Sequence, residues 1–524
     1  MAVLNWERLP FADLGPLAAT TSFLSVSTFL YILSIVTYRL YFHPLAKYPG
    51  PLFARISPIP ITYSLLRGRI PFYVKACHDK YGSVVRVSPN ELCFDDESAW
   101  KDIYGSRPGH KNFHKDPIHV GSIAAVHGVS TITMANDTDH ARQRRALSHA
   151  FSTKALLEQE YIVKNYIDIF SSKMQEFAKG DGIVDVTDWF AYTTFDVIGD
   201  MALGEPFGCL TSEDFRFWVP LISESIKAGA IEQATRRMAS TGSPLQRFLQ
   251  WCIPNHVRET RQKHFDYSKE KILKRMEQTQ SDHRDFLYYV MKQQDKGDLN
   301  LDEVIVNGAL FIIAGTETTA GFLTGLFNLI TRPDNKHILD KLTKEIRSKF
   351  KTDKDLNYED LSKLPYMSAV IDEGLRMFPS APIGFVRTVP SGGDTVSGHY
   401  VPGGTTVSVC MWAATHSARN FKDPYVFRPE RWLDRENTED KLGASNAFSL
   451  GPRGCIGRNL SYMEMRLIMG KLLWHNDVSM VDCEGNEKWN PKNEYANMVV
   501  YNNWIKPSFK IKLTPRRGQF GLGR

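Results

Sequence analysis

Residues 448–458 read Phe-Ser-Leu-Gly-Pro-Arg-Gly-Cys-Ile-Gly-Arg, and this stretch decides how the rest of the chain is interpreted. It places one thiol, that of Cys455, in a glycine-rich loop. Apolar residues at helical spacing follow the cysteine, so a helix is predicted to begin directly after it. The amino end of a helix favours an anion, and a thiolate can ligate a metal or act as a nucleophile. The glycines allow unusual dihedral angles and close approach to a ligand. Arg453 is predicted to place a fixed positive charge beside the sulfur.

The same loop resembles the signature of the cytochrome P450 family, Phe-x-x-Gly-x-Arg-x-Cys-x-Gly. All five specified positions are filled, by Phe448, Gly451, Arg453, Cys455 and Gly457. A lone cysteine in a glycine-rich turn would more often be a buried structural residue. With the whole pattern present, the resemblance implies that Cys455 is the axial thiolate of a heme b iron. Electron donation from such a thiolate favours cleavage of the oxygen–oxygen bond. Phe448, Arg453 and Gly457 are then part of the heme-binding loop.

Residues 302–330 are predicted to form one long helix through the core, because the residues around Phe311 are apolar on every side. This helix contains Ala-Gly-Thr-Glu-Thr-Thr at 314–319. A carboxylate and hydroxyls are costly in a buried helix unless they are hydrogen bonded, and a threonine can loosen the helix by bonding the i−4 carbonyl. A hydrogen-bonded kink is the structural alternative. The run resembles the family's oxygen-activation groove, which implies that Glu317 is the acid and Thr318 the alcohol.

Residues 137–145 are predicted to open a helix that carries His140 and Arg144 one turn apart on one face. Two cations on one face would bind an anion, whereas an ordinary solvated basic face is the alternative. The family usually has Trp-x-x-x-Arg at this point, and His140 replaces the tryptophan. The resemblance implies that His140 and Arg144 bind a heme propionate and that Arg387 is a second propionate ligand.

Glu373 and Arg376 lie at i and i+3, which alone indicates only a minor surface contact. The sequence Pro-Glu-Arg-Trp follows at 429–432. The two elements match the Glu-x-x-Arg and Pro-Glu-Arg-Trp elements of the family in order and spacing. The resemblance therefore implies that Glu373, Arg376 and Arg431 form a buried charge network that supports the heme loop.

The segment 14–38 contains no charged residue and would reach about 37 Å as a helix, enough to cross a hydrocarbon core of ~30 Å. It is predicted to be a transmembrane anchor. A cleaved signal peptide is the alternative, but the segment is too long and no basic start precedes it. Basic residues follow the segment and acidic residues precede it, which predicts a cytosolic catalytic part. The predicted divisions are a lumenal N-terminus at 1–13, the anchor at 14–38, a proline-rich hinge at 39–55, the catalytic domain at 56–513 and a disordered basic tail at 514–524.

Weaker signals indicate the remaining secondary structure. Residues 83–94 are predicted to form a β-hairpin, 161–294 mostly amphipathic helix, and 383–386 and 396–409 short strands. The chain is thus expected to be mainly α with a small β-sheet region, the cytochrome P450 fold. By the resemblance, the substrate cavity is lined by the loop near 108–130, the helix face around Ala314, residues 383–385 and the turn near 499–501.

The amino-acid composition indicates which binding partners and cofactors are expected. The net charge of +6 is mild and diffuse, so nucleic acid is not expected as a partner. Seven scattered cysteines without Cys-x-x-Cys spacing indicate neither a disulfide framework nor a zinc site. No nucleotide-binding fingerprint is present, so electrons must come from another protein. The resemblance implies NADPH–cytochrome P450 reductase as that partner, with cytochrome b5 as a second.

The resemblance, together with the predicted anchor, implies a monooxygenase in the endoplasmic reticulum membrane that hydroxylates or epoxidises an apolar small molecule. The proline-rich stretch 41–51 and the replacement of tryptophan by His140 resemble the filamentous-fungal members of the family, which implies secondary metabolism and a terpenoid or polyketide substrate. A heme-thiolate isomerase or dehydratase that needs no reductase is one alternative, against which Glu317 and Thr318 argue. A non-catalytic heme sensor is the other.

Overall fold

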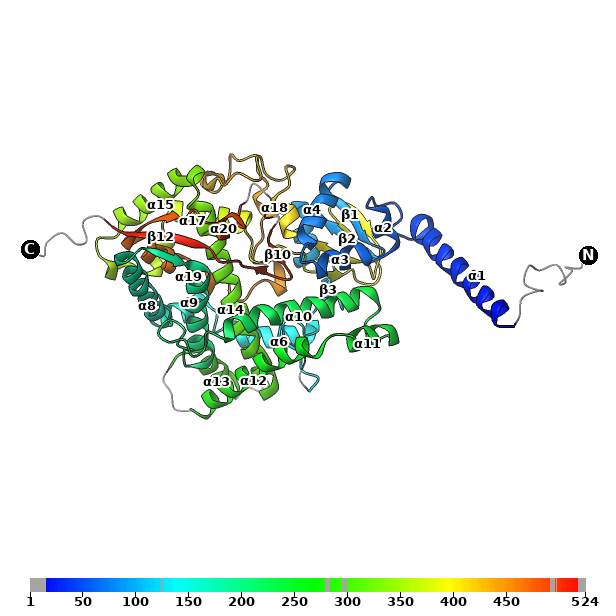
Figure 1. Cartoon of the computed structure of the whole chain (residues 1–524), viewed down its shortest axis with the longest axis horizontal. Helices are drawn as coiled ribbons and strands as arrows, with labels where there is room; N and C mark the ends of the chain where they lie inside the picture. Colours follow the sequence, from blue (N-terminus) through cyan, green and yellow to red (C-terminus); the bar gives the residue numbers. More distant parts are fainter. Residues whose placement is uncertain are drawn as a thin grey trace, which may run out of the picture.

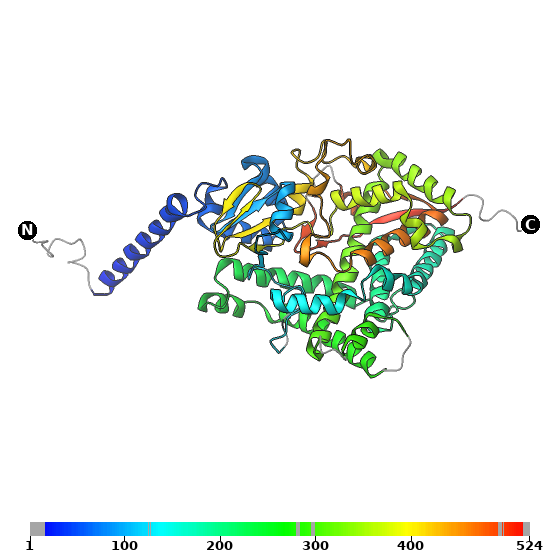
Figure 2. The same ribbon diagram turned by 180° about the vertical axis from the view of Figure 1, so that it is seen from behind.

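The structure is a computed structural model that describes residues 16–123, 125, 127–278, 283–294, 299–490, 495 and 497–516. Its fold is mainly helical with small β-sheets, as predicted, and one helix, α1, projects from the compact body (Figure 1). The predicted lumenal segment 1–13 and most of the predicted basic tail lie outside the described residues. Figure 2 shows the same body from behind, with α1 again projecting from one end.

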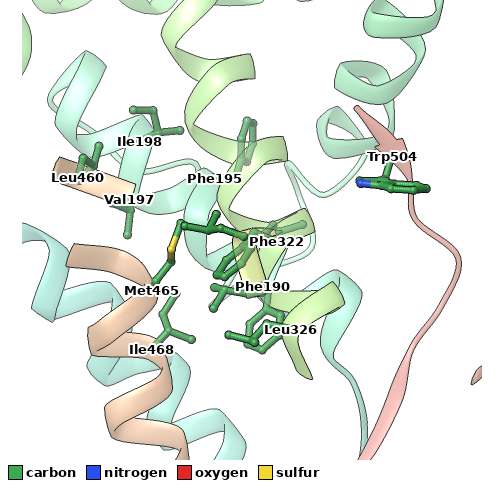
Figure 3. Close-up of a cluster of buried hydrophobic side chains, with 14 of the residues drawn as sticks. Phe190, Phe195, Val197, Ile198, Phe322, Leu326, Leu460, Met465, Ile468 and Trp504 are labelled. Carbon is green, nitrogen blue, oxygen red and sulfur yellow. The ribbon is translucent and has the colours of Figure 1, made fainter. Parts of the chain in front are cut away.

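The centre of the body is built on α14 (Leu301–Ile330), the predicted long core helix. It begins at a capping box in which the Asn300 side chain and Glu303 satisfy each other's backbone amides. It packs against α9 (Val186–Leu203) and α19 (Arg458–His475). Apolar side chains from the three helices interdigitate there (Figure 3), among them Phe190, Phe195, Phe322, Leu326, Met465 and Ile468. Because α19 begins three residues after Cys455, the same contact fixes the cysteine loop beside α14.

The remaining helices surround this centre. Those before α14 are α2 (Leu52–Ile56), α3 (Ile59–Leu66), α4 (Ile70–Tyr81), α5 (Glu97–Tyr104), α6 (Asp137–Ser148), α7 (Thr153–Glu158), α8 (Glu160–Lys179), α10 (Trp218–Met238), α11 (Pro244–Trp251), α12 (Asn255–Glu277) and α13 (Phe286–Gln294). Those after it are α15 (Lys336–Lys349), α16 (Tyr358–Ser362), α17 (Pro365–Met377), α18 (Met411–Thr415), the 3₁₀ helix η5 (Pro429–Trp432) and α20 (Glu484–Glu487). The prediction of mostly helix over 161–294 is confirmed.

The largest sheet has the order β1-β2-β8-β5-β3. Its strands are β1 (Val84–Ser88), β2 (Glu91–Phe94), β8 (Thr406–Val409), β5 (Arg387–Thr388) and β3 (His114–Lys115). The predicted hairpin at 83–94 is β1 and β2, and it is confirmed. The predicted strand at 383–386 is wrong: only Gly384 forms an isolated bridge there, to Cys410. Gly384 packs so tightly against Ser408 that a β-carbon would lie 2.7 Å from its hydroxyl, and regular pairing begins only at Arg387.

Three smaller sheets complete the β structure. They are β4 (Ile183–Asp185) with β12 (Lys510–Pro515) and β9 (Asn476–Met480), the hairpin of β6 (Asp394–Val396) and β7 (His399–Val401), and the hairpin of β10 (Val499–Val500) and β11 (Trp504–Ile505). The short strands predicted over 396–409 correspond to β7 and β8, with β6 ending at Val396. The β10–β11 hairpin turn reaches back toward the centre of the body.

The amino-terminal helix α1 (Pro16–Thr37) continues into a π-helical turn, η2 (Tyr38–Phe42). The stretch Thr20–Phe42 is apolar and long enough to cross a membrane, and none of it is buried. Among the described residues, α14 passes the same test, but 83% of it lies inside the body. The chain between 43 and 51 is free of helix, as the prolines predict, whereas helix returns at Leu52.

Hydrogen bonds from three arginine side chains attach the segment that follows α1 to the body. Arg39 donates to the Ile56 carbonyl at 2.5 Å, and Arg86 donates to the Arg39 carbonyl at 2.8 Å. Arg55 donates to the carbonyls of Leu40 and Ala46, each at 3.2 Å. The base of α1 is therefore fixed to the sheet by side-chain hydrogen bonds.

Candidate active site

The cysteine loop is shaped by one glycine in particular. Gly451 has φ of 69°, and a β-carbon there would lie 2.0 Å from the Tyr104 carbonyl, so only glycine fits. Gly454 and Gly457 have ordinary negative φ values, so the predicted unusual dihedrals are not general to the loop. The Cys455 amide donates to the Phe448 carbonyl at 2.8 Å, which closes the loop just before α19 begins.

The Cys455 thiol faces an internal cavity. Burial raises the pKa of this thiol, although the Gly457 amide, Arg144 and Arg458 act in the opposite direction. The amides at the start of α19 favour the thiolate, as the sequence suggested, but burial outweighs them. A coordinated metal ion would deprotonate the thiol. The prediction that Arg453 lies beside the sulfur is wrong. Its guanidinium turns toward α6 and donates to the Ala135 carbonyl at 2.7 Å and to Asp137 at 2.9 Å.

Two adjoining cavities of about 190 and 310 Å³ lie between the cysteine loop and α14. Both are lined by Cys455, Ala314 and Thr318. Ala314 is exposed in the middle of an otherwise buried helix because it faces these cavities. The Thr318 hydroxyl donates to the Ala314 carbonyl at 2.7 Å, which is the i−4 bond anticipated from the sequence. The thiol and the threonine thus meet across one internal space.

Glu317 is buried beside Thr318 and lines the larger cavity. Its carboxylate lies 2.5 Å from the Lys506 ammonium and accepts a hydrogen bond from the Ser223 hydroxyl at 3.0 Å. Lys506 follows β11 and Ser223 belongs to α10, so α14 is tied to two distant segments at this carboxylate. Sequence reasoning missed both partners because nothing in their local sequence marks them.

A group of basic side chains lines the cavities on the side of β3, β5 and α6. Arg144 donates to the Gly454 carbonyl at 2.7 Å, and the side chain of buried Arg387 donates, among the described residues, only to the carbonyl of Val386, at 3.1 Å. A second nitrogen of Arg453, Nη1, is buried with no partner among the described residues. His140 lines the smaller cavity, but burial, with nearby Arg453 and Arg144, lowers its pKa to about 4. Without a bound anion, His140 is therefore neutral near pH 7, and of the two predicted cations on this helix face only Arg144 carries a charge.

Lys115 is a further basic residue here, and the sequence gave no indication of it. It pairs in register with Arg387 across β3 and β5 and lines both cavities. None of the described acidic side chains forms an ion pair with either residue. Burial lowers the pKa of Lys115 well below its ordinary value, and Arg387 and Arg453 lower it further. A group of basic side chains in which Lys115 and Arg387 lack an acidic partner among the described residues fits a ligand that carries carboxylates, as the propionates of heme do.

A second carboxyl group, that of Glu464 on α19, also reaches the smaller cavity. Burial raises its pKa to about 8, although a hydrogen bond with Thr319 lowers it somewhat, so the group is protonated at pH 7. One of its oxygens has no partner among the described residues. An acid on the apolar side of a predicted helix was the signal that could have identified it.

The residues that line the cavities agree only in part with those predicted from the sequence. The loop at 108–130 contributes His119–Ser122, and Phe385 contributes from the stretch 383–385. The turn expected near 499–501 instead places Asn502 and Asn503 at the cavity, because the β10–β11 turn comes after Val500. Phe448 also lines the larger cavity, and Gly457 the smaller one.

The structure brings Glu373, Arg376 and Arg431 together in a fully buried network. Glu373 accepts from Arg376 at 2.8 and 2.9 Å and from Arg431 at 3.3 Å. The Trp432 indole and the Arg428 amide, each at 2.9 Å, complete the partners of the same carboxylate. Arg376 and Arg431 further bind main-chain carbonyls, and Arg431 binds Asp440. The network joins α17 to η5.

Comparison with known proteins gives consistent matches. The family described as "Cytochrome P450" matches residues 54–503. The chain is 41% identical to "Cytochrome P450 monooxygenase aba2" of Botryotinia fuckeliana over 518 residues, which cover 97% of this chain and 98% of that one. It is 40% identical to "Cytochrome P450 monooxygenase ABA2" of Pyricularia oryzae, covering 90% of this chain and 92% of the other. It is also 40% identical to "Cytochrome P450 monooxygenase astJ" of Aspergillus oryzae, covering 92% and 94%.

Proposed function

Because the chain belongs to the cytochrome P450 family of monooxygenases, we propose that it inserts one oxygen atom of dioxygen into an apolar small molecule by hydroxylation or epoxidation. The second oxygen atom leaves as water, and NADPH supplies two electrons through a reductase. The observation that carries the proposal is that Cys455 and Thr318, from opposite walls, line the same internal cavity.

Family membership implies a heme cofactor, and the residues fit it. Cys455 would hold the iron, while Arg144, Arg387, Arg453 and Lys115 would bind the propionates and His140 would pack beside them as a neutral group. Heme, when bound, supplies the activation of dioxygen and the transfer of oxygen to the substrate. The chain's own tasks are to hold the cofactor, exclude water, orient the substrate and supply protons.

We assign the supply of protons for the reaction to two residues of α14, Glu317 and Thr318. The Thr318 hydroxyl faces the cavity and can hold a water molecule there, while the neighbouring Glu317 carboxylate can pass protons toward it. The Lys506 ammonium and the Ser223 hydroxyl both bind the Glu317 carboxylate and fix its position beside Thr318. Lys506 is therefore a positioning residue for Glu317.

The larger cavity is lined mainly by apolar groups and admits a small, mostly apolar substrate. The kinship with fungal monooxygenases supports a place in fungal secondary metabolism, with a terpenoid or polyketide substrate. The unburied apolar stretch Thr20–Phe42 supports attachment to the endoplasmic reticulum with the body in the cytosol. NADPH–cytochrome P450 reductase is the proposed electron donor, with cytochrome b5 as a second donor.

The test replaces Thr318 by alanine. Thr318→Ala should keep heme and substrate binding, because neither needs the hydroxyl, while the product formed per NADPH falls by up to about 10²-fold and peroxide rises. Thr324→Ala is the matched control, since the Thr324 hydroxyl makes the same i−4 bond, to Ala320 at 2.9 Å, in the buried part of α14. Product, peroxide and NADPH are measured together with reductase and a panel of terpenoids and polyketides.

Unchanged coupling in Thr318→Ala would contradict the role of this hydroxyl. Conversion of a substrate without reductase or NADPH would indicate an isomerase or dehydratase instead. Heme binding without NADPH consumption for any substrate would indicate a sensor.

A further inference from the structure

The loop that forms one wall of the larger cavity is held by a clamp made of Glu232, Arg236 and Arg261. Arg236 of α10 donates to the carbonyls of Pro117 and His119 at 3.0 and 3.3 Å. Arg261 of α12 donates to the carbonyls of Gly121 and Ser122 at 2.9 and 3.1 Å. Four loop carbonyls are therefore held by two guanidinium groups.

A single carboxylate organises both arginines. Glu232 accepts from Arg236 through one oxygen and from Arg261 through the other, each at 2.7 Å. Burial would raise the pKa of Glu232, but Arg261 and Arg236 outweigh it and hold the pKa below its ordinary value, so the carboxylate is ionised near pH 7. Without this charge, each arginine loses the partner that fixes its orientation toward the loop.

The clamp is the main polar attachment of this part of the loop. Within the described residues, the main chain of 120–123 forms no hydrogen bond to another main-chain group. The loop also lies close against α10, because a β-carbon at Gly229 would be 3.3 Å from the Gly121 carbonyl. A segment held by side chains alone can move without breaking a sheet or a helix.

The clamped loop separates two cavities. Gly121 and Ser122 line the larger cavity beside Cys455. Ile123, on the other side, lines a separate cavity of about 700 Å³ that is open to the surface between α10, α11 and α12, which we call the outer cavity. Glu232 and Arg261 line the outer cavity themselves, together with the apolar side chains of Trp251 and Phe265. The wall between the two cavities is therefore the short stretch 121–123, and the clamp binds two of its main-chain carbonyls.

We propose that the Glu232–Arg236–Arg261 clamp is a gate, and that the apolar substrate occupies the outer cavity before the gate admits it to the cavity beside Cys455. The proposal rests on the proposed function, because it takes the substrate to be an apolar small molecule. The gate sets how fast ligands pass and leaves the affinity of the inner site nearly unchanged, since the clamp residues do not line it.

The test is a binding experiment on the heme-loaded full chain. The probe is 4-phenylimidazole, an apolar compound whose nitrogen ligates heme iron, and stopped-flow absorbance follows its binding. Glu232→Gln should raise the association and dissociation rate constants together, by roughly tenfold each, while the dissociation constant changes little. Deuterium uptake by the amides of 117–123 should rise in the same variant.

Glu205→Gln is the matched control. Glu205 also lies between two cations of α12, Lys271 at 2.6 Å and Lys274 at 2.9 Å, but does not touch the loop. It should bind 4-phenylimidazole at the wild-type rates. Equal rates in wild type, Glu232→Gln and Glu205→Gln would overturn the proposal, as would a change in affinity without a change in both rates.

This experiment uses neither NADPH nor a reductase, so a failed gate and a failed monooxygenase assignment give different results. Gly229→Ala provides a second variant that keeps all three clamp residues and pushes the loop outward. It should speed probe passage in the same direction, and wild-type rates in both Glu232→Gln and Gly229→Ala would exclude a gate at this loop.

Discussion

Lys115 and Arg387 occupy directly opposite positions on β3 and β5. Like charges directly opposite each other on neighbouring strands destabilise their pairing, and buried charges without partners cost more. No described carboxylate forms an ion pair with either side chain. The sheet end is therefore built to receive an anionic ligand, and cofactor binding and pairing of β3 with β5 should be coupled.

Replacing Lys115 tests this coupling, because it should weaken heme binding and at the same time stabilise the heme-free protein. Lys115→Met should release heme to apomyoglobin about tenfold faster, because one charge-assisted contact to a propionate is lost. The heme-free variant should instead unfold at a higher urea concentration than the heme-free wild type, because a partly buried lysine that lies opposite Arg387 and has no described acidic partner has been removed.

Two variants control the measurement. Lys115→Arg should retain heme like the wild type, and Lys111→Met changes an exposed lysine of the same segment and should alter neither property. Heme loss from Lys115→Met at the wild-type rate would contradict a contact between Lys115 and the cofactor.

For single residues, the sequence identified the site residues that belong to short local motifs. It missed the site residues whose partners lie far away along the chain. Cys455 and Thr318 stand in short patterns that can be read directly. Lys506 meets Glu317 across 189 positions of the chain, and no local pattern predicts such a meeting. The neutral state of His140 could not be predicted either, because it depends on burial and on Arg453, which comes from another segment.

Among the elements, α17 and η5 depend on each other through Glu373. Arg376 satisfies this carboxylate and also donates to three main-chain carbonyls, those of Thr415 and Pro424 at 2.8 Å each and that of Val426 at 3.3 Å. Arg376→Ala would leave a fully buried carboxylate short of one partner, which costs on the order of 3–5 kcal/mol. The variant should therefore unfold at a much lower urea concentration and recover little heme during expression.

A surface ion pair at the same element is the control. Lys341 reaches Glu430 of η5 at 2.9 Å, and both side chains are about half exposed. Lys341→Ala should cost under about 1 kcal/mol. If Arg376→Ala were no less stable than Lys341→Ala, the Glu373 network would be an ordinary contact with no role in supporting the heme loop.

Element predictions succeeded where periodicity or turn signals were strong. The core helix and the hairpin at 83–94 were predicted within about one residue, and the helix predicted directly after Cys455 begins three residues later, at Arg458. The strand at 383–386 failed because an apolar run next to a proline has the same composition whether it pairs or lines a cavity. Phe385 lines the substrate cavity instead.

Over the whole molecule, α1 is not the only exposed apolar surface. In α11, Leu245, Phe248 and Trp251 are 56%, 56% and 74% exposed, and in α2, Leu52 and Phe53 are 56% and 71% exposed. Exposed apolar groups of this kind indicate contact with a membrane or a partner. The proposed membrane attachment therefore includes α11 as a second contact.

Removing residues 1–42 should convert tight membrane attachment into weak binding, measured by sedimentation with phosphatidylcholine vesicles in high salt. Adding Phe248→Ser and Trp251→Ser to the truncated chain should abolish the remaining binding. The control is Tyr400→Ser, which changes a 54% exposed tyrosine on β7. Vesicle binding that survives loss of both α11 aromatics would contradict contact through α11.

The arginine bonds at the base of α1 have a mechanical consequence. Since Arg39, Arg55 and Arg86 fix this base to α2 and to β1, the body cannot rotate freely relative to α1. The inclination of one helix in the bilayer would then be transmitted to the whole catalytic body. Bilayer thickness, by changing that inclination, would set how deeply the mouth of the outer cavity sits among the lipid headgroups.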